Sequence, residues 1–224
     1  MVVICLVFLL AIFSSKAQDD ICPGAVAERE TYLLVDCPPF HNCILRIYYC
    51  CFFDETNQEL TVRIKQIHFL GQTDDRSSRA AWNCYLACYR YNEEKFWDDV
   101  ASGIVKDLKR YDNPCLPFVP ECGGGGNAFI IVKITRSTCW YFENFWFTKY
   151  EDQWLLGMKP CGVEKCFWEY KICKRGGDVE ILEKLKYATA PPECNWEEPT
   201  ELPPPGKTWE EYWRTDCFPK PCVF

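Results

Sequence analysis

The sequence predicts a mainly β (α+β) fold, in which disulfide-rich antiparallel hairpins and sheets are joined by one amphipathic helix. Three observations predict this class. Several segments alternate apolar and polar residues between turn-forming stretches, as antiparallel strands do. Cysteine is frequent, at 17 of 224 residues. One long stretch repeats apolar residues at intervals of three and four, which is typical of an amphipathic helix.

The chain begins with a predicted signal peptide at residues 1–17. Val2 to Phe13 is an unbroken apolar run, and the small residues Ser15 and Ala17 follow where signal peptidase reads the chain. The run is shorter than the roughly 20 residues that a membrane-spanning helix needs. We expect cleavage after Ala17, with an uncleaved signal anchor as the alternative because no Lys or Arg precedes the run.

The remaining cysteines decide the class of protein. Cys5 lies in the signal, so 16 of the 17 belong to the mature chain, and an even set in an exported protein predicts disulfides. Spacing alone does not reveal which cysteines pair. The set comprises Cys22, Cys37, Cys43, Cys50, Cys51, Cys84, Cys88, Cys115, Cys122, Cys139, Cys161, Cys166, Cys173, Cys194, Cys217 and Cys222. We therefore expect a secreted protein, located outside the cell or in the cell envelope or periplasm.

The N-terminal half predicts a strand and then a long hairpin. Glu30 to Asp36 is the first strand, and Cys43 to Phe53 is rich in Ile, Tyr, Cys and Phe. The polar residues 54–59 turn the chain, and Leu60 to Leu70 returns with Leu60, Val62 and Ile64 alternating against Thr61, Arg63 and Lys65. Residues 80–90 are compatible with a short helix or with an extended segment.

The amphipathic helix is predicted at residues 93–109. Asn92 is placed to cap it, and Glu93 and Glu94 lie near its positive end. Pro114 and the prolines beyond it forbid its continuation.

The C-terminal half predicts one strand and two more hairpins. Residues 128–134 form the strand, and residues 138–148 pair with 154–158. Residues 166–173 pair with the segment that starts at Val179. In this last hairpin Glu169 and Lys171 are expected to face residues on the return strand, namely Glu180, Lys184 and Lys186.

The hairpin regions 37–70 and 161–187 share a cysteine spacing. Each carries two cysteines seven residues apart, which places them on opposite faces of a strand and prevents them from bonding to each other. The pairs are Cys43 with Cys50 and Cys166 with Cys173. We interpret this as a diverged internal repeat, with simple recurrence in a cysteine-rich chain as the alternative.

The predicted domains are one β-dominated body at 18–190 and a tail at 191–224. The tail is rich in proline and is tethered by its own cysteines. Within it, Thr208 and Glu211 match a capping box before Trp209 and Trp213.

Charge and motifs exclude several functions. Removal of Lys16 with the signal leaves 24 basic against 32 acidic residues, which argues against nucleic acid and anionic membranes as partners. There is no Cys-x-x-Cys and no Gly-x-Ser-x-Gly, and the chain has only two histidines, His41 and His68. Cys37, His41 and Cys43 could supply zinc ligands, but in an exported chain disulfides are the preferred interpretation. We predict no catalytic, cofactor-binding or metal-binding residue, and His68 is interpreted as structural.

Aromatic residues supply the one candidate contact surface. Trp140, Phe142 and Trp146 share one face of the predicted strand 138–148, where they could stack on sugar rings or on a protein. A place in the core is the alternative.

The function that we expect is a structural, adhesive or partner-binding role without catalysis. The partner would be a protein or a glycan, and self-assembly is compatible with the sequence. A secreted carbohydrate-active hydrolase is one alternative, and it would need two carboxylates facing a cleft. A small inhibitor or toxin-like binder is the other, with the loop between Cys115 and Cys122 as its contact segment.

Overall fold

The computed structural model describes residues 22–110, 112–115, 119–123, 129–148, 152–176 and 178–222. The predicted signal peptide lies outside these residues, as do residues 116–118 of the loop between Cys115 and Cys122.

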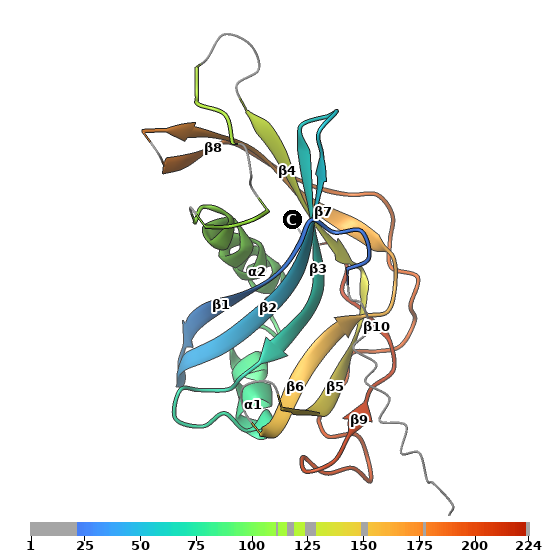
Figure 1. Cartoon of the computed structure of the whole chain (residues 1–224). Coiled ribbons are helices and arrows are strands. Elements are labelled where there is room, and N and C mark those ends of the chain that lie inside the picture. Colours follow the sequence, from blue (N-terminus) through green and yellow to red (C-terminus); the bar gives the residue numbers. More distant parts are fainter. Residues whose placement is uncertain are drawn as a thin grey trace, which may run out of the picture.

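Within the described ranges, ten strands form one mixed sheet with two helices against it (Figure 1). The mainly β prediction is confirmed. The strands are β1 (Ala27–Cys37), β2 (Phe40–Asp54), β3 (Glu59–Phe69), β4 (Ile130–Ser137), β5 (Cys139–Phe147), β6 (Gln153–Pro160), β7 (Glu164–Arg175), β8 (Asp178–Ala188), β9 (Trp213–Arg214) and β10 (Phe218–Pro219). The helices are α1 (Ser78–Cys88) and α2 (Glu93–Leu108).

The sheet divides at β3. One edge of β3 pairs with β2 over nearly its whole length. On its other edge, Glu59 to Arg63 pairs with β4 in parallel, and Ile67 to Phe69 pairs with β6 in antiparallel. The branch through β4 continues to β7 and β8, and the branch through β6 continues to β5, which carries both β9 and β10.

The predicted first hairpin is confirmed as β2 and β3, with β1 added to its outer edge. Its alternation follows burial, since every second residue of β2 from Cys43 to Cys51 lies in the core. Those side chains point to the helices. A Cβ added at Gly103 of α2 would lie 3.5 Å from Ile47, at ordinary van der Waals distance, so this part of α2 packs directly on β2.

Helix α2 confirms the predicted amphipathic helix. The Asn92 side chain accepts a hydrogen bond from the Lys95 backbone N–H at 3.1 Å, as a capping residue does. Phe96, Trp97 and Val100 are among the apolar residues that the helix buries against the sheet.

Helix α1 resolves the segment that the sequence left open. Ser77 caps it by accepting a hydrogen bond from the Ala80 N–H. Cys84 and Cys88 lie four residues apart and therefore on one side of the helix. Both bond to the β1–β2 region, so α1 is covalently fixed to the sheet.

The hairpin of β7 and β8 is confirmed, but its expected charge pairs are not. Ile172 pairs with Ile181 and Lys171 with Glu183, so Leu182 is an extra residue on β8. This bulge shifts the register, and Lys171 bonds Glu183 instead of the residues predicted. Lys184 and Lys186 lie on the other face, where they pair with Asp98 of α2.

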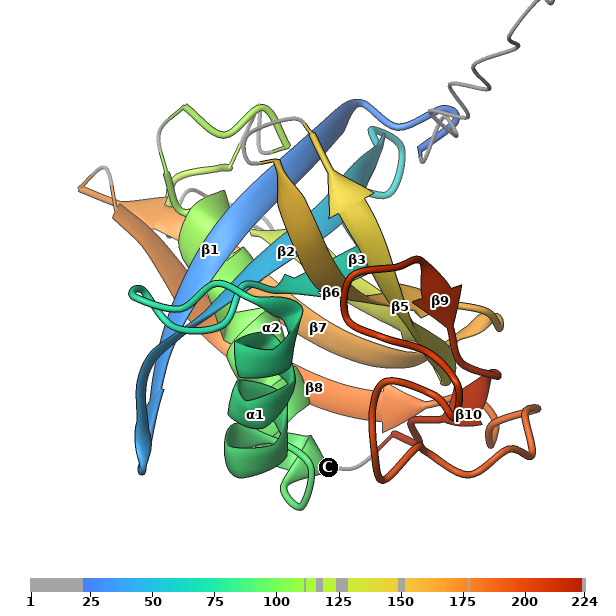
Figure 2. The same ribbon diagram turned by 90° about the horizontal axis from the view of Figure 1, so that it is seen from below.

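The segment after residue 190 is part of the fold. Its two short strands, β9 and β10, both pair with β5 (Figure 2). The expected capping box is present in part, because the Thr208 N–H donates to the Glu211 carboxylate at 2.8 Å, but the structure has only turns there.

Candidate functional site

All 16 cysteines of the described residues form disulfides. The pairs are Cys22–Cys50, Cys37–Cys88, Cys43–Cys84, Cys51–Cys115, Cys122–Cys173, Cys139–Cys194, Cys161–Cys217 and Cys166–Cys222. As expected, cysteines seven residues apart bond to other partners. Extensive cross-linking of this kind indicates an extracellular or otherwise oxidising environment.

The residues considered for zinc are used differently. Cys37 and Cys43 belong to two neighbouring disulfides, whose sulfur atoms on Cys37, Cys43 and Cys88 lie within 4.8 Å of one another. The His41 ring instead contacts Asp36, with 2.6 Å between Nδ1 and Oδ1. Sulfur atoms held in disulfides are not thiolate ligands, so this cluster serves as a covalent link.

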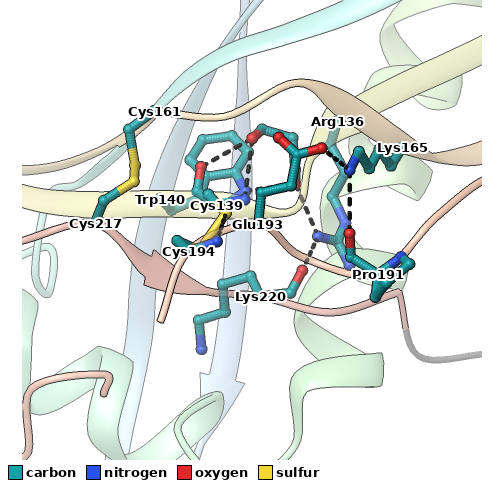
Figure 3. The surroundings of a disulfide bond; sticks show 11 residues. Arg136, Cys139, Trp140, Cys161, Lys165, Pro191, Glu193, Cys194, Cys217 and Lys220 are labelled. Atoms are coloured by element: carbon teal, nitrogen blue, oxygen red, sulfur yellow. Dashed lines mark hydrogen bonds and ion pairs between the residues drawn. A yellow bond between two sulfur atoms is a disulfide. The ribbon is translucent and has the colours of Figure 1, made fainter. Parts of the chain in front are cut away.

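A second pair of neighbouring disulfides holds the C-terminal segment (Figure 3). The sulfur atoms of Cys139, Cys194 and Cys217 lie within 4.8 Å of one another. The Cys194 backbone N–H also donates to the sulfur of Cys139 at 3.2 Å. Two covalent bonds and one hydrogen bond therefore fix this segment beside β5.

Two buried cations, Arg136 and Lys220, also hold the C-terminal segment in place. Arg136 donates to the backbone oxygen of Lys220 at 2.6 Å (Figure 3). It also donates to the backbone oxygen of Pro221 at 2.7 Å. The Lys220 ammonium in turn donates to the Tyr85 hydroxyl at 2.9 Å and to Glu198 at 2.7 Å. Arg136 and Lys220 thus bind the C-terminal segment to β4 and to α1, which indicates a structural network.

The predicted aromatic contact face has to be corrected. Trp140 and Phe142 are completely buried, because α1, α2 and β10 cover that side of β5. Trp146 lies farther along the strand, beyond this cover, and is 49% exposed. Of the three, Trp146 alone has a surface that a partner can reach.

His68 is buried on the opposite face of the sheet. Its ring lies 4.7 Å from that of Tyr48 and 4.9 Å from that of Phe145, and neither ring nitrogen has a hydrogen-bond partner. Burial lowers the pKa of His68 well below 6.5, and the charges of Arg46 and Lys159 lower it further. The imidazole is therefore neutral and shielded from solvent.

The exposed tryptophan borders a hollow of about 620 Å³ that opens to solvent. We refer to it as the tryptophan hollow, because Trp146, Trp154 and Trp209 line it together. These three residues come from β5, β6 and the segment before β9. The start of α1 closes the remaining side, and Figure 1 shows α1, β5, β6 and β9 at the same end of the molecule.

Two of the tryptophans form a corner. Trp146 and Trp154 are directly opposed across β5 and β6. Their ring centroids lie 5.5 Å apart with the planes at 77°, an edge-to-face arrangement. The third, Trp209, is held by Trp213, whose ring lies at the same 5.5 Å and whose indole N–H donates to the Thr208 oxygen.

The polar lining of the hollow contains an unpaired buried hydroxyl. Ser78 is 3% exposed, and its Oγ has no hydrogen-bond partner. The adjacent Ser77 is occupied as the helix cap, and its N–H donates to Asp75 at 3.0 Å. That bond keeps the pKa of Asp75 below its usual range, so this carboxylate is ionised.

The charge of the lining is predominantly negative. Asp75, Asp152 and Glu210 contribute carboxylates, and Arg79 contributes the one cation among the described lining residues. Sequence reasoning identified Trp146 and the pairing of Trp209 with Trp213, but it missed the hollow because the lining residues lie in three distant segments.

Comparison of the chain with protein-family models, curated proteins and solved structures finds no match. Neither helix of the described part of the chain has the length and apolar character of a membrane span.

Proposed function

We propose that this is a secreted, disulfide-stabilised binding protein without catalytic activity, which takes its ligand in the tryptophan hollow. One observation carries the proposal. Three tryptophans line one open hollow, and Trp146 keeps 49% of its surface exposed there, whereas Trp140 and Phe142 of the same strand are completely buried. Exposing indole rings is costly in water, and concave aromatic sites with a few polar groups are typical of ligand binding.

Disulfides, a short strand and a hydrogen bond hold the walls of the hollow in place. Cys43–Cys84 and Cys37–Cys88 fix α1, whose first turn forms one wall. The short strand β9 joins the Trp209 segment to β5, and the Asn144 side chain donates to the Trp209 backbone oxygen at 2.8 Å. A pre-ordered site loses little conformational entropy when it binds.

A ligand screen by thermal denaturation tests the proposal. Wild-type protein, the variants W146A and W154A, and the control W196A would be melted with small ammonium compounds, amino acids, monosaccharides and disaccharides. Trp196 is 62% exposed and lies outside the hollow, so it reports loss of a surface indole alone. We expect at least one compound to raise the melting temperature of wild type and W196A but of neither hollow variant.

Two results would count against the proposal. A ligand whose effect is unchanged in W146A and W154A would place binding elsewhere. Chemical conversion of the bound compound, measured by mass spectrometry after incubation, would show that the protein is an enzyme.

A further inference from the structure

Resting on the proposed function, we infer that the ligand of the tryptophan hollow is a small organic cation, an ammonium compound. Two features of the hollow lead to this class. They are the corner formed by Trp146 and Trp154 and the excess of carboxylates.

The angle between the two indoles favours a compact ligand. A sugar ring stacks on a flat aromatic face, and two rings that serve one sugar chain present their faces side by side. Trp146 and Trp154 instead stand at 77° to each other and form two walls of a box. A roughly spherical ammonium group can contact the electron-rich faces of such walls, whereas a flat ring meets one face only.

The carboxylates of the lining favour a positively charged ligand. Asp152 and Glu210 are exposed on the rim, and Asp75 is kept ionised by Ser77. Against them stands Arg79. An excess of negative groups next to indole faces attracts cations by two independent effects, since the ring quadrupole and the carboxylates act in the same direction.

The net charge of the chain favours the same ligand over long range. The formal charge is −7 at pH 7, which raises the local concentration of small cations near the surface. This contribution weakens with added salt, because the rim carboxylates are solvent-exposed.

The inference is tested by isothermal titration calorimetry with matched probes. Choline carries the trimethylammonium group and a hydroxyl, and 3,3-dimethyl-1-butanol is its neutral isostere of nearly equal shape. Tetramethylammonium has the charge without the hydroxyl, and methyl β-cellobioside represents sugars. We expect choline to bind wild type at least ~10-fold more tightly than the neutral isostere, as cation–π and carboxylate attraction together imply.

Variants assign that difference to residues. W146A and W154A should abolish choline binding, and D152N/E210Q should weaken choline several-fold while leaving the neutral isostere unchanged. The double variant E55Q/D178N removes two exposed carboxylates, one in the turn after β2 and one at the start of β8, neither of which lines the hollow. It is the matched charge control, and W196A is the indole control. Circular dichroism and melting curves confirm that each variant is folded.

The outcomes separate this inference from the proposed function. Equal affinity for choline and its neutral isostere would refute the inference that the ligand is a cation. The proposed binding function would stand. Binding of the cellobioside alone, lost in W146A, would also overturn the inference and support the proposed function with a sugar ligand. If no probe binds wild type at about 10 mM, the inference fails. If, in addition, no compound raises the melting temperature in the broader thermal screen, the proposed function fails as well.

Discussion

The guanidinium of Arg136 lies over the indole of Trp97, with its central carbon 4.0 Å from the ring centroid. Arg136 follows the end of the parallel register between β3 and β4, and Trp97 belongs to α2. The same guanidinium holds two carbonyls of the C-terminal segment. One side chain thus joins the sheet, a helix and the tail, at a point where the arginine is completely buried.

Replacing Arg136 by methionine should destabilise the protein by about 3 kcal/mol, because two backbone oxygens lose their donor inside the protein. Methionine keeps most of the volume, so the loss reports hydrogen bonds and the contact with Trp97. Urea unfolding measures it. Arg175, whose side chain is 70% exposed, provides the control R175M, for which a change within about 0.5 kcal/mol is expected. A similar loss in both variants would contradict the role assigned to Arg136.

His68 should make stability fall in mild acid. The folded state holds the neutral ring, since its pKa lies well below 6.5, whereas the unfolded chain binds a proton once the pH drops below that value. Stability is therefore complete above pH 6.5 and is lost by up to about 1.4 kcal/mol per pH unit as the pH falls towards the folded pKa. The variant H68F should remove this contribution to the slope. A slope that stays unchanged in H68F would contradict this assignment.

The disulfides should react in the order of their exposure. Cys161 is exposed and its partner Cys217 is half-buried, whereas Cys51 and Cys115 are both completely buried. Since exchange requires access of a thiolate to sulfur, limited dithiothreitol followed by iodoacetamide should label Cys161 and Cys217 first. Peptide mass spectrometry reads the order. Simultaneous labelling of Cys51 and Cys115 would mean that reduction proceeds through global unfolding.

Gly71 should tolerate alanine poorly. Its φ of +71° favours glycine, and a Cβ there would lie 2.4 Å from the backbone oxygen of Asp75. Gly206 has a similar φ of +78° but nothing within 4 Å of the added atom, so G206A isolates the backbone cost of about 1 kcal/mol. We expect G71A to lose at least about 2 kcal/mol, because the clash adds to that cost. It should also weaken ligand binding, since Asp75 lines the hollow. Equal melting temperatures of the two variants would contradict this.

Local pattern was sufficient wherever a residue's environment depends on its near neighbours. The alternation of β3 and the apolar spacing and Asn92 cap of α2 are visible in the sequence because period and cap chemistry act within a few residues. The β7–β8 pairing failed in detail for the opposite reason. A single bulge at Leu182 changes the cross-strand partner of every later residue of β8, and no Gly, Pro, Asn or Asp marks that position in the sequence.

By itself, the sequence determined that the chain is mainly β with one amphipathic helix and that the cysteines from Cys22 to Cys222 form pairs. Periodicity and an even cysteine count are enough for both. Only the tertiary structure decided that Trp140 is core and Trp146 is surface, although the two lie on one face of one strand. The cover over β5 ends between them, and that cover consists of helices and a C-terminal segment far away in the chain. The tryptophan hollow also depends on contacts between distant segments, and such contacts cannot be predicted from a local sequence pattern.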